Sequence, residues 1–374
     1  MSPSVTDETV PYVWGPTFEE MCNPSLIPEG TREAARLART EDPLDPVNLY
    51  NIHWKDDLGN VMALVLPPEL TGVSTPIAVL TGLKFPTGAH KVGPAYSILI
   101  EKQVHGEVVP GKHRLVFPST GNFGIGGSWV GPRMGYSSLV VLPEDMSRER
   151  FEMIRGFGGE IIATHGSESN VKEIYDKVKE LEVDPRNAIL NQFAEFGNYR
   201  FHAAVTASAM SELATALGRQ GIGSGKPTVM VSAMGSAGTI AAGDALKERH
   251  GTLIVGLEPI QCPTLYNVGF GAHRIEGIGD KHVTWVHNVL NMDALMCIDD
   301  VDTVRGMELL EHGGDVLTRD LGIDEDQVAR FRGVFGMSGV CNVLGAIKAA
   351  KFYKLGASDL IVTVATDGYD RYPS

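Results

Sequence analysis

A tight polar turn from Pro86 to Lys91 carries a single lysine into a predicted helix over Val92 to Gln103. The N-terminal end of a helix is unfavourable for a cation. A lysine at this point therefore indicates a specific partner, or a lowered pKa that makes its amine nucleophilic. We interpret Lys91 as a candidate for a Schiff base with an aldehyde cofactor, the alternative being a solvated surface lysine.

Two further loops could bind anions. The segment Ser119 to Gly124 follows an apolar strand and offers hydroxyls, an amide and free backbone N–H groups, which suit a carboxylate at a helix N-terminus. The loop from Met234 to Thr239 also joins a strand to a helix, and its small residues let backbone amides converge on one phosphate. Its spacing does not give the glycine fingerprint of a dinucleotide site.

The polar segment Ala365 to Gly368, at the end of the last predicted strand, is a further candidate for ligand binding. The carboxyl ends of strands face the ligand cleft in α/β folds. His282 and His287 have no carboxylate or thiol companions, so no metal site is predicted.

The elements that position these loops alternate between apolar strands and amphipathic helices, which is typical of parallel α/β architecture. We predict strands at His113–Pro118, Ser137–Leu142, Glu160–Thr164, Thr228–Ala233, Leu253–Glu258 and Leu360–Ala365. We predict helices at Gly124–Gly135, Arg148–Gly156, Asn170–Leu181, Thr239–His250, Asp302–Glu311 and Val340–Tyr353.

The pattern favours two doubly wound α/β domains with a ligand cleft between them. Residues 81–195 would form the smaller domain, which carries the Ser119 loop, and residues 45–80 with 196–374 the larger, phosphate-binding one. Residues 1–44 are expected to be an extension without clear periodicity. The stretch His312–Gly333 looks like an inserted polar surface segment.

Composition narrows the class of protein. The chain has 374 residues and 46 acidic against 32 basic side chains, which argues against nucleic acid or an anionic membrane as a main partner. The four cysteines form no C-x-x-C pair, so neither a disulfide framework nor a zinc site is indicated. Without a secretory signal or a long apolar run, we expect a cytoplasmic protein.

Taken together and in order, these motifs resemble the pyridoxal-phosphate enzymes of the cysteine synthase and tryptophan synthase β family. The turn Thr87–Lys91 is similar to the cofactor-lysine motif of tryptophan synthase β, and Ser119–Gly124 to the cysteine synthase substrate loop. The resemblance runs from about residue 80 to 372. Its other matches are Asn191–Phe193 with His202 and Thr206, Gly235–Thr239, Gly256–Pro259, Glu276–Gly279 and Asp370–Tyr372.

The resemblance implies a tryptophan synthase β-like fold, a homodimer, a small amino-acid substrate and a role for each site residue. Lys91 would hold pyridoxal 5'-phosphate as an internal aldimine and then remove the substrate α-proton. Asn122 would bond the phenolic oxygen of the cofactor, and Thr366 would face its pyridine nitrogen. The phosphate would bind Gly235, Ser236, Ala237, Gly238 and Thr239. The substrate would bind Ser119, Thr120, Gly121, Phe123 and Gln192.

Two departures from the family pattern bear on the reaction. Phe123 stands where a small polar residue is usual, and this, with the inserted segment, inclines the reading toward β-elimination, with β-replacement as the alternative. Thr366 and Asp367 adjoin, and a hydroxyl at the pyridine nitrogen suits elimination or replacement, whereas an aspartate would allow racemisation or transamination. Two other readings stay open: a non-catalytic regulatory relative, and a phosphate-binding α/β enzyme that does not need Lys91.

Overall fold

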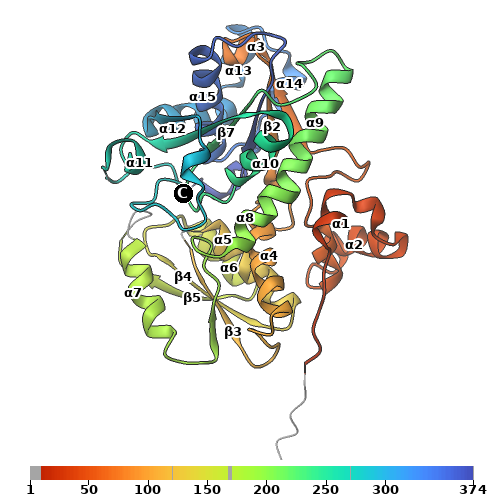
Figure 1. Ribbon diagram of the computed structural model, residues 1–374, viewed down its shortest axis with the longest axis vertical. Coiled ribbons are helices and arrows are strands. Elements are labelled where there is room, and N and C mark those ends of the chain that lie inside the picture. Colours follow the sequence, from red (N-terminus) through yellow and green to blue (C-terminus); the bar gives the residue numbers. More distant parts are fainter. Residues whose placement is uncertain (1–9, 120, 167–170, 270, 374) are drawn as a thin grey trace, which may run out of the picture.

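A computed structural model of the protein describes residues 10–119, 121–166, 171–269 and 271–373. Figure 1 shows two stacked α/β lobes, with the C-terminus lying where they meet and the N-terminal helices on one side. Each lobe is built on its own sheet, one of four strands and one of six. The predicted α/β class with two sheets is therefore confirmed.

The smaller sheet is entirely parallel, in the order β5-β4-β3-β6. Its strands are β3 (Arg114–Pro118), β4 (Ser137–Pro143), β5 (Glu160–Thr164) and β6 (Asn187–Ile189). Its helices are α4 (Val92–Val104), α5 (Asn122–Arg133), α6 (Arg148–Gly156) and α7 (Val171–Leu181). The central strands are buried because helices cover both faces of a parallel sheet.

The larger sheet has the order β1-β2-β10-β7-β8-β9, parallel except for the edge strand β1. Its strands are β1 (Ala63–Leu66), β2 (Ile77–Thr81), β7 (Val229–Ala233), β8 (Leu253–Pro259), β9 (Ala294–Ile298) and β10 (Ile361–Ala365). The long helices around it are α9 (Ala207–Arg219), α10 (Ala241–His250), α12 (Asp300–His312) and α15 (Met337–Phe352).

Short elements join and extend these layers. They are α3 (Pro68–Thr71), α8 (Phe196–Phe201), α11 (Thr264–Asn267), the π-helical turn His202–Thr206, and 3-10 turns at Pro24–Leu26, Pro46–Asn51, Gly82–Lys84, Val289–Asn291 and Tyr369–Arg371.

The N-terminal extension is more ordered than its sequence indicated. It contains α1 (Phe18–Cys22), closed by a capping box from Thr17, and the longer α2 (Glu29–Glu41). Helix α2 buries only Ala35 and Ala38, two small side chains, so no large apolar residues mark its inward face in the sequence. Met21 and Ile27 anchor the extension in the protein interior.

The expectation of a polar surface segment at His312–Gly333 holds in part, because most of its residues are exposed but several apolar side chains reach the core. The segment forms α13 (Gly314–Arg319) and α14 (Glu325–Ala329), and buries Leu317, Ile323, Val328 and Phe331 in the core of the larger lobe. Its apolar side chains are widely spaced between charged ones, which hid their common buried face. Within the described residues, no helix combines the length and apolar character that a bilayer crossing needs.

Candidate active site

Lys91 lies directly before α4, between the two lobes. Its Nζ donates to Ser236 Oγ at 3.0 Å and to Gln192 Oε1 at 3.3 Å. Burial lowers the pKa of Lys91 to about 8, and the carboxylates of Asp280 and Asp367 oppose this shift. A larger fraction of the amine is therefore unprotonated near neutral pH than for an exposed lysine, which favours nucleophilic attack.

The Ser119 loop connects β3 to α5. Ser119 Oγ accepts hydrogen bonds from the backbone N–H groups of Gly121 at 3.0 Å and Gly124 at 2.9 Å, which fixes the turn. Phe123 is buried, packs edge-on against Phe117 and lines the same cavity as Lys91. Thr120, a predicted carboxylate ligand, lies outside the described residues.

The loop Gly235–Thr239 leaves the carboxyl end of β7, and all five of its residues line the cavity. Ala237 has a φ of 59°, so successive N–H groups turn to one side and form a concave anion site. A Cβ on Gly238 would lie 2.0 Å from Asn198 Oδ1, and one on Gly235 2.5 Å from the Gly277 carbonyl oxygen. Both glycines are therefore required by close packing.

Behind this loop lies a buried pair of imidazoles. His90 Nε2 is 3.3 Å from Thr239 Oγ1, and the His90 ring packs edge-on against that of His202. Burial lowers the pKa of both histidines well below the usual value, so both rings are neutral. Trp54 joins the cluster by donating to Thr206 Oγ1 at 3.0 Å, an atom 2.9 Å from His202 Nδ1.

Thr366 and Asp367, the two candidate partners of the pyridine nitrogen, follow β10 and lie in different surroundings. Thr366 lines the cavity, whereas Asp367 is fully buried behind it. Asp367 Oδ2 accepts from Asn122 Nδ2 at 2.5 Å and from the Tyr372 hydroxyl at 2.9 Å. Asn122 Oδ1 in turn accepts from Arg371 Nε at 2.8 Å. Asp367 Oδ2 is thus held in a hydrogen-bond network, and Thr366 is the one of the two residues that lines the cavity.

Sequence reasoning missed several residues of this region. Gly277 and Ser338 also line the cavity, and Asn198 donates to the Ser236 hydroxyl at 3.1 Å. Burial raises the pKa of Asp280 to about 7, against the attraction of Lys91. The Gly-rich run Glu276–Gly279 in front of Asp280 was the available signal for that loop, and Ser338 had only its place at a helix start.

Comparison with known proteins identifies the family. A model described as pyridoxal-phosphate dependent enzyme matches residues 77–367. The chain belongs to this family. It is 30% identical over 293 residues to a probable cysteine synthase of Bacillus subtilis, covering 77% of this chain and 85% of that protein.

Solved structures agree in fold. A hydrogen sulfide-producing enzyme from Fusobacterium nucleatum has 26% identity and a TM-score of 0.68, over 84% of this chain and 86% of that one. A cysteine synthase from Entamoeba histolytica has a TM-score of 0.70 over 87% and 88% of the two chains, and its 22% identity supports the fold alone. The predicted cysteine synthase-like family, fold type II and the pyridoxal 5'-phosphate cofactor are confirmed.

The residues of the cavity fit this cofactor. They combine a half-buried lysine amine, a loop in which a residue with positive φ turns the backbone amides toward one point, and a hydroxyl at a strand end. The amine suits the aldehyde of the cofactor, the backbone amides suit its phosphate, and the hydroxyl suits its pyridine nitrogen. Apart from Thr120 and Gly121, every predicted site residue lines the one cavity, namely Lys91, Ser119, Asn122, Phe123, Gln192, Gly235, Ser236, Ala237, Gly238, Thr239 and Thr366. Gly121 lies in the Ser119 turn beside it.

Proposed function

We propose that this pyridoxal-phosphate enzyme catalyses β-replacement of the cysteine synthase type, exchanging the β-substituent of a small amino acid for a nucleophile. Relatives described as cysteine synthases support this reading over the β-elimination that Phe123 and the segment His312–Gly333 favoured.

The proposed roles follow the cavity. Lys91 would bind the cofactor covalently and carry the substrate α-proton. The cofactor, when bound, supplies an electron sink for the carbanion at that carbon. Ser119, Thr120 and Gln192 would hold the substrate carboxylate, with Gly121 and Phe123 shaping that pocket, and Asn122 would orient the ring. The loop Gly235–Thr239 would hold the phosphate.

The observation that carries the reaction class is that Thr366 lines the cavity, whereas Asp367 is fully buried and bonded to Asn122. A hydroxyl leaves a pyridine nitrogen unprotonated and the electron sink mild, which supports loss or exchange of a β-group. A carboxylate would stabilise the carbanion more strongly and would suit racemisation or transamination. Elimination remains the second candidate, because one similar structure is named a hydrogen sulfide-producing enzyme.

The test offers the purified holoenzyme L-serine and its O-acyl and O-phospho derivatives, with and without sulfide or a small thiol. Replacement predicts a new amino acid, seen by mass spectrometry, only when the nucleophile is present. Keto acid and ammonia formed equally without a nucleophile would favour elimination. If no substrate gives either product, the non-catalytic alternative is supported. We further propose a homodimer, which light scattering of the holoenzyme would reveal as twice the chain mass.

A further inference from the structure

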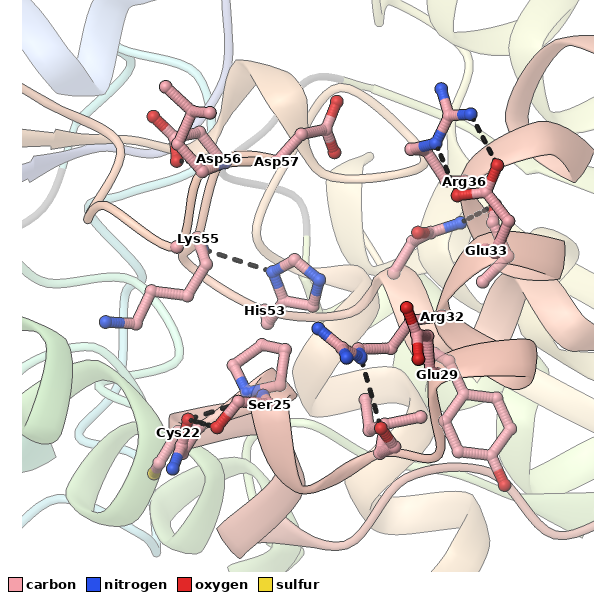
Figure 2. A pocket seen from close by; sticks show the side chains of 18 of the residues that line it. Cys22, Ser25, Glu29, Arg32, Glu33, Arg36, His53, Lys55, Asp56 and Asp57 are labelled. Carbon is pink, nitrogen blue, oxygen red and sulfur yellow. Dashed lines mark hydrogen bonds and ion pairs between the residues drawn. The ribbon is translucent and has the colours of Figure 1, made fainter.

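A second cavity, of about 810 Å³, lies outside the cleft that holds Lys91. Its walls come from the N-terminal extension, from the turn at residues 50–59 and from α9, through Ser208 and Glu212. Figure 2 shows charged and polar side chains of these segments around the hollow. Most of these charges are paired with one another, so the unpaired ones indicate what the cavity could bind.

His53 supplies a buried donor. The residue is only 7% exposed, and its Nδ1 accepts the backbone N–H of Lys55 at 3.1 Å. Burial and the nearby Arg39 lower the pKa of His53 to about 4, so the ring is neutral at physiological pH. Because Nδ1 is an acceptor, the proton of the neutral ring is on Nε2. No described residue accepts a hydrogen bond from this N–H.

Arg32 supplies the second donor. Its Nε donates to the Ile27 carbonyl oxygen at 3.1 Å, and within the described chain no carboxylate lies within ion-pair distance of its guanidinium. In Figure 2, Arg32 and His53 face the same hollow. The other basic side chains of the cavity each have an acidic partner: Arg36 with Glu33, Arg39 with Asp57 and Lys55 with Glu212.

Glu29 is the remaining acidic group. It lines the cavity one helical turn before Arg32 and forms no ion pair with any described residue. Asp56, by contrast, accepts from the backbone N–H groups of Leu58 and Asn60 and so holds its own turn. The cavity therefore presents two convergent donors, one of them a guanidinium fork suited to a carboxylate, together with one free carboxylate.

We propose that this cavity is a second ligand site for a small zwitterionic α-amino acid, separate from the catalytic cleft. The ligand carboxylate binds the Arg32 guanidinium and the His53 Nε2–H, and its ammonium group binds Glu29. Such a ligand would pair the His53 N–H together with the charges of Arg32 and Glu29, which are otherwise exposed to solvent on α2. A simple anion would leave the Glu29 carboxylate without a partner and would place a second negative charge close to it.

The test titrates the holoenzyme with the common L-amino acids by calorimetry while the cofactor absorbance is recorded. Binding in the catalytic cleft changes that absorbance, whereas the proposed site gives heat without such a change. Hydrogen exchange locates the site, with protection expected at residues 22–39 and 50–59. Arg32→Met should weaken this binding at least about tenfold, since hydrogen bonds to charged groups contribute more than ordinary ones.

Arg36→Met is the matched control, because Arg36 lines the same cavity on the same helix but is already paired. It should leave the affinity unchanged, and both variants should keep the cofactor spectrum of the parent. Glu29→Gln should weaken the amino acid but not its deaminated analogue. Equal affinity of the parent protein for amino acid and deaminated acid, or no second binding event at millimolar ligand, would overturn the proposal.

Discussion

At the residue scale, the site depends on two ionisable groups whose pKa values are moved toward each other. Burial lowers the pKa of Lys91 to about 8 and raises that of Asp280 to about 7. Each charge partly stabilises the other, so neither shift is as large as burial alone would give. A pKa near the operating pH suits a group that takes up and releases protons during a reaction.

Replacing Lys91 by alanine should remove the visible absorbance band of the holoenzyme and reduce turnover by about 10³-fold or more, because the covalent anchor and the proton carrier are lost together. Absorbance spectra and the product assay measure both effects. Lys84→Ala is the control, since Lys84 is exposed on the preceding turn. A Lys91→Ala protein with normal turnover would support the phosphate-binding alternative that does not need this lysine.

Asp280→Asn should stabilise the cofactor-free protein in a pH-dependent way. The pKa of Asp280 is raised from 3.8 to about 7, so its ionisation costs stability as pH rises between these values. The two proteins should be equally stable below about pH 4, and the variant should gain on the order of 4 kcal/mol by pH 7. Urea unfolding across this pH range measures the difference. A constant difference at every pH would exclude this titration as its source.

Part of the site could be predicted from single residues. Lys91, Ser236 and Thr366 each stand where a strand ends or a helix begins, so their place in a cleft follows from the local pattern. The contacts of His90 and Asp280 could not be predicted in this way. Each meets its partner through a loop more than a hundred residues away in the chain, and spacing in the sequence carries no signal for that distance.

At the element scale, the position of Lys91 depends on the packing of α4 against α8. Gly93, two residues after Lys91, is in contact with the ring of Phe201, and a Cβ there would lie 2.1 Å from Phe201 Cζ. The two helices can therefore approach closely only with glycine at this point. The close approach of the two helices therefore fixes the position of Lys91.

Gly93→Ala should destabilise the protein by about 1 to 3 kcal/mol through overpacking and weaken cofactor binding by displacing the start of α4. Thermal unfolding and cofactor titration are the measurements. In Gly30→Ala, the matched change in α2, the new Cβ would have no atom within 4 Å. That variant should gain up to about 1 kcal/mol from helix propensity. Equal effects of the two changes would contradict the packing argument.

Element boundaries were predicted well where the apolar period changed sharply. Arg148–Gly156 and Glu160–Thr164 match the structure, and most other predicted elements end within two residues of the observed ones. The prediction missed the three-residue edge strand β6 and the weakly buried helix α2, and also the buried strand β2 and the longer helix α9. Short or weakly buried elements owe their form to tertiary contacts, which local pattern does not record.

At the scale of the whole molecule, a buried charge network joins the smaller lobe to the C-terminal tail. Arg150 of α6 is fully buried, lies 2.9 Å from Glu276 Oε2 and donates to the Tyr372 hydroxyl at 3.2 Å. Tyr372 continues the network to Asp367, and Arg371 adds a hydrogen bond to the Thr87 carbonyl oxygen. The turn before Lys91 and the tail are therefore held by one set of contacts.

Arg150→Met should cost about 3 kcal/mol of stability, because it removes a fully buried cation and leaves the half-buried Glu276 without its ion-pair partner. Chemical denaturation measures the loss. Arg148→Met on the same helix is the control, since Arg148 is exposed and its ion pair with Glu152 is a surface one. That control should change stability by less than about 1 kcal/mol. Similar losses of stability for both variants would show that the buried network stabilises the protein no more than a surface ion pair does.

The order of strands has a consequence for how the protein is made. The four strands of the smaller sheet come from one stretch, residues 114–189, so that lobe can fold while the ribosome is still translating the rest. The larger sheet is different, because β10, its last strand in sequence, lies in its middle between β2 and β7. Until residue 365 has left the ribosome, β2 and β7 have no common neighbour. The newly made chain must therefore carry an incomplete sheet, and a catalytic cleft with one wall unfinished, until β10 has been made.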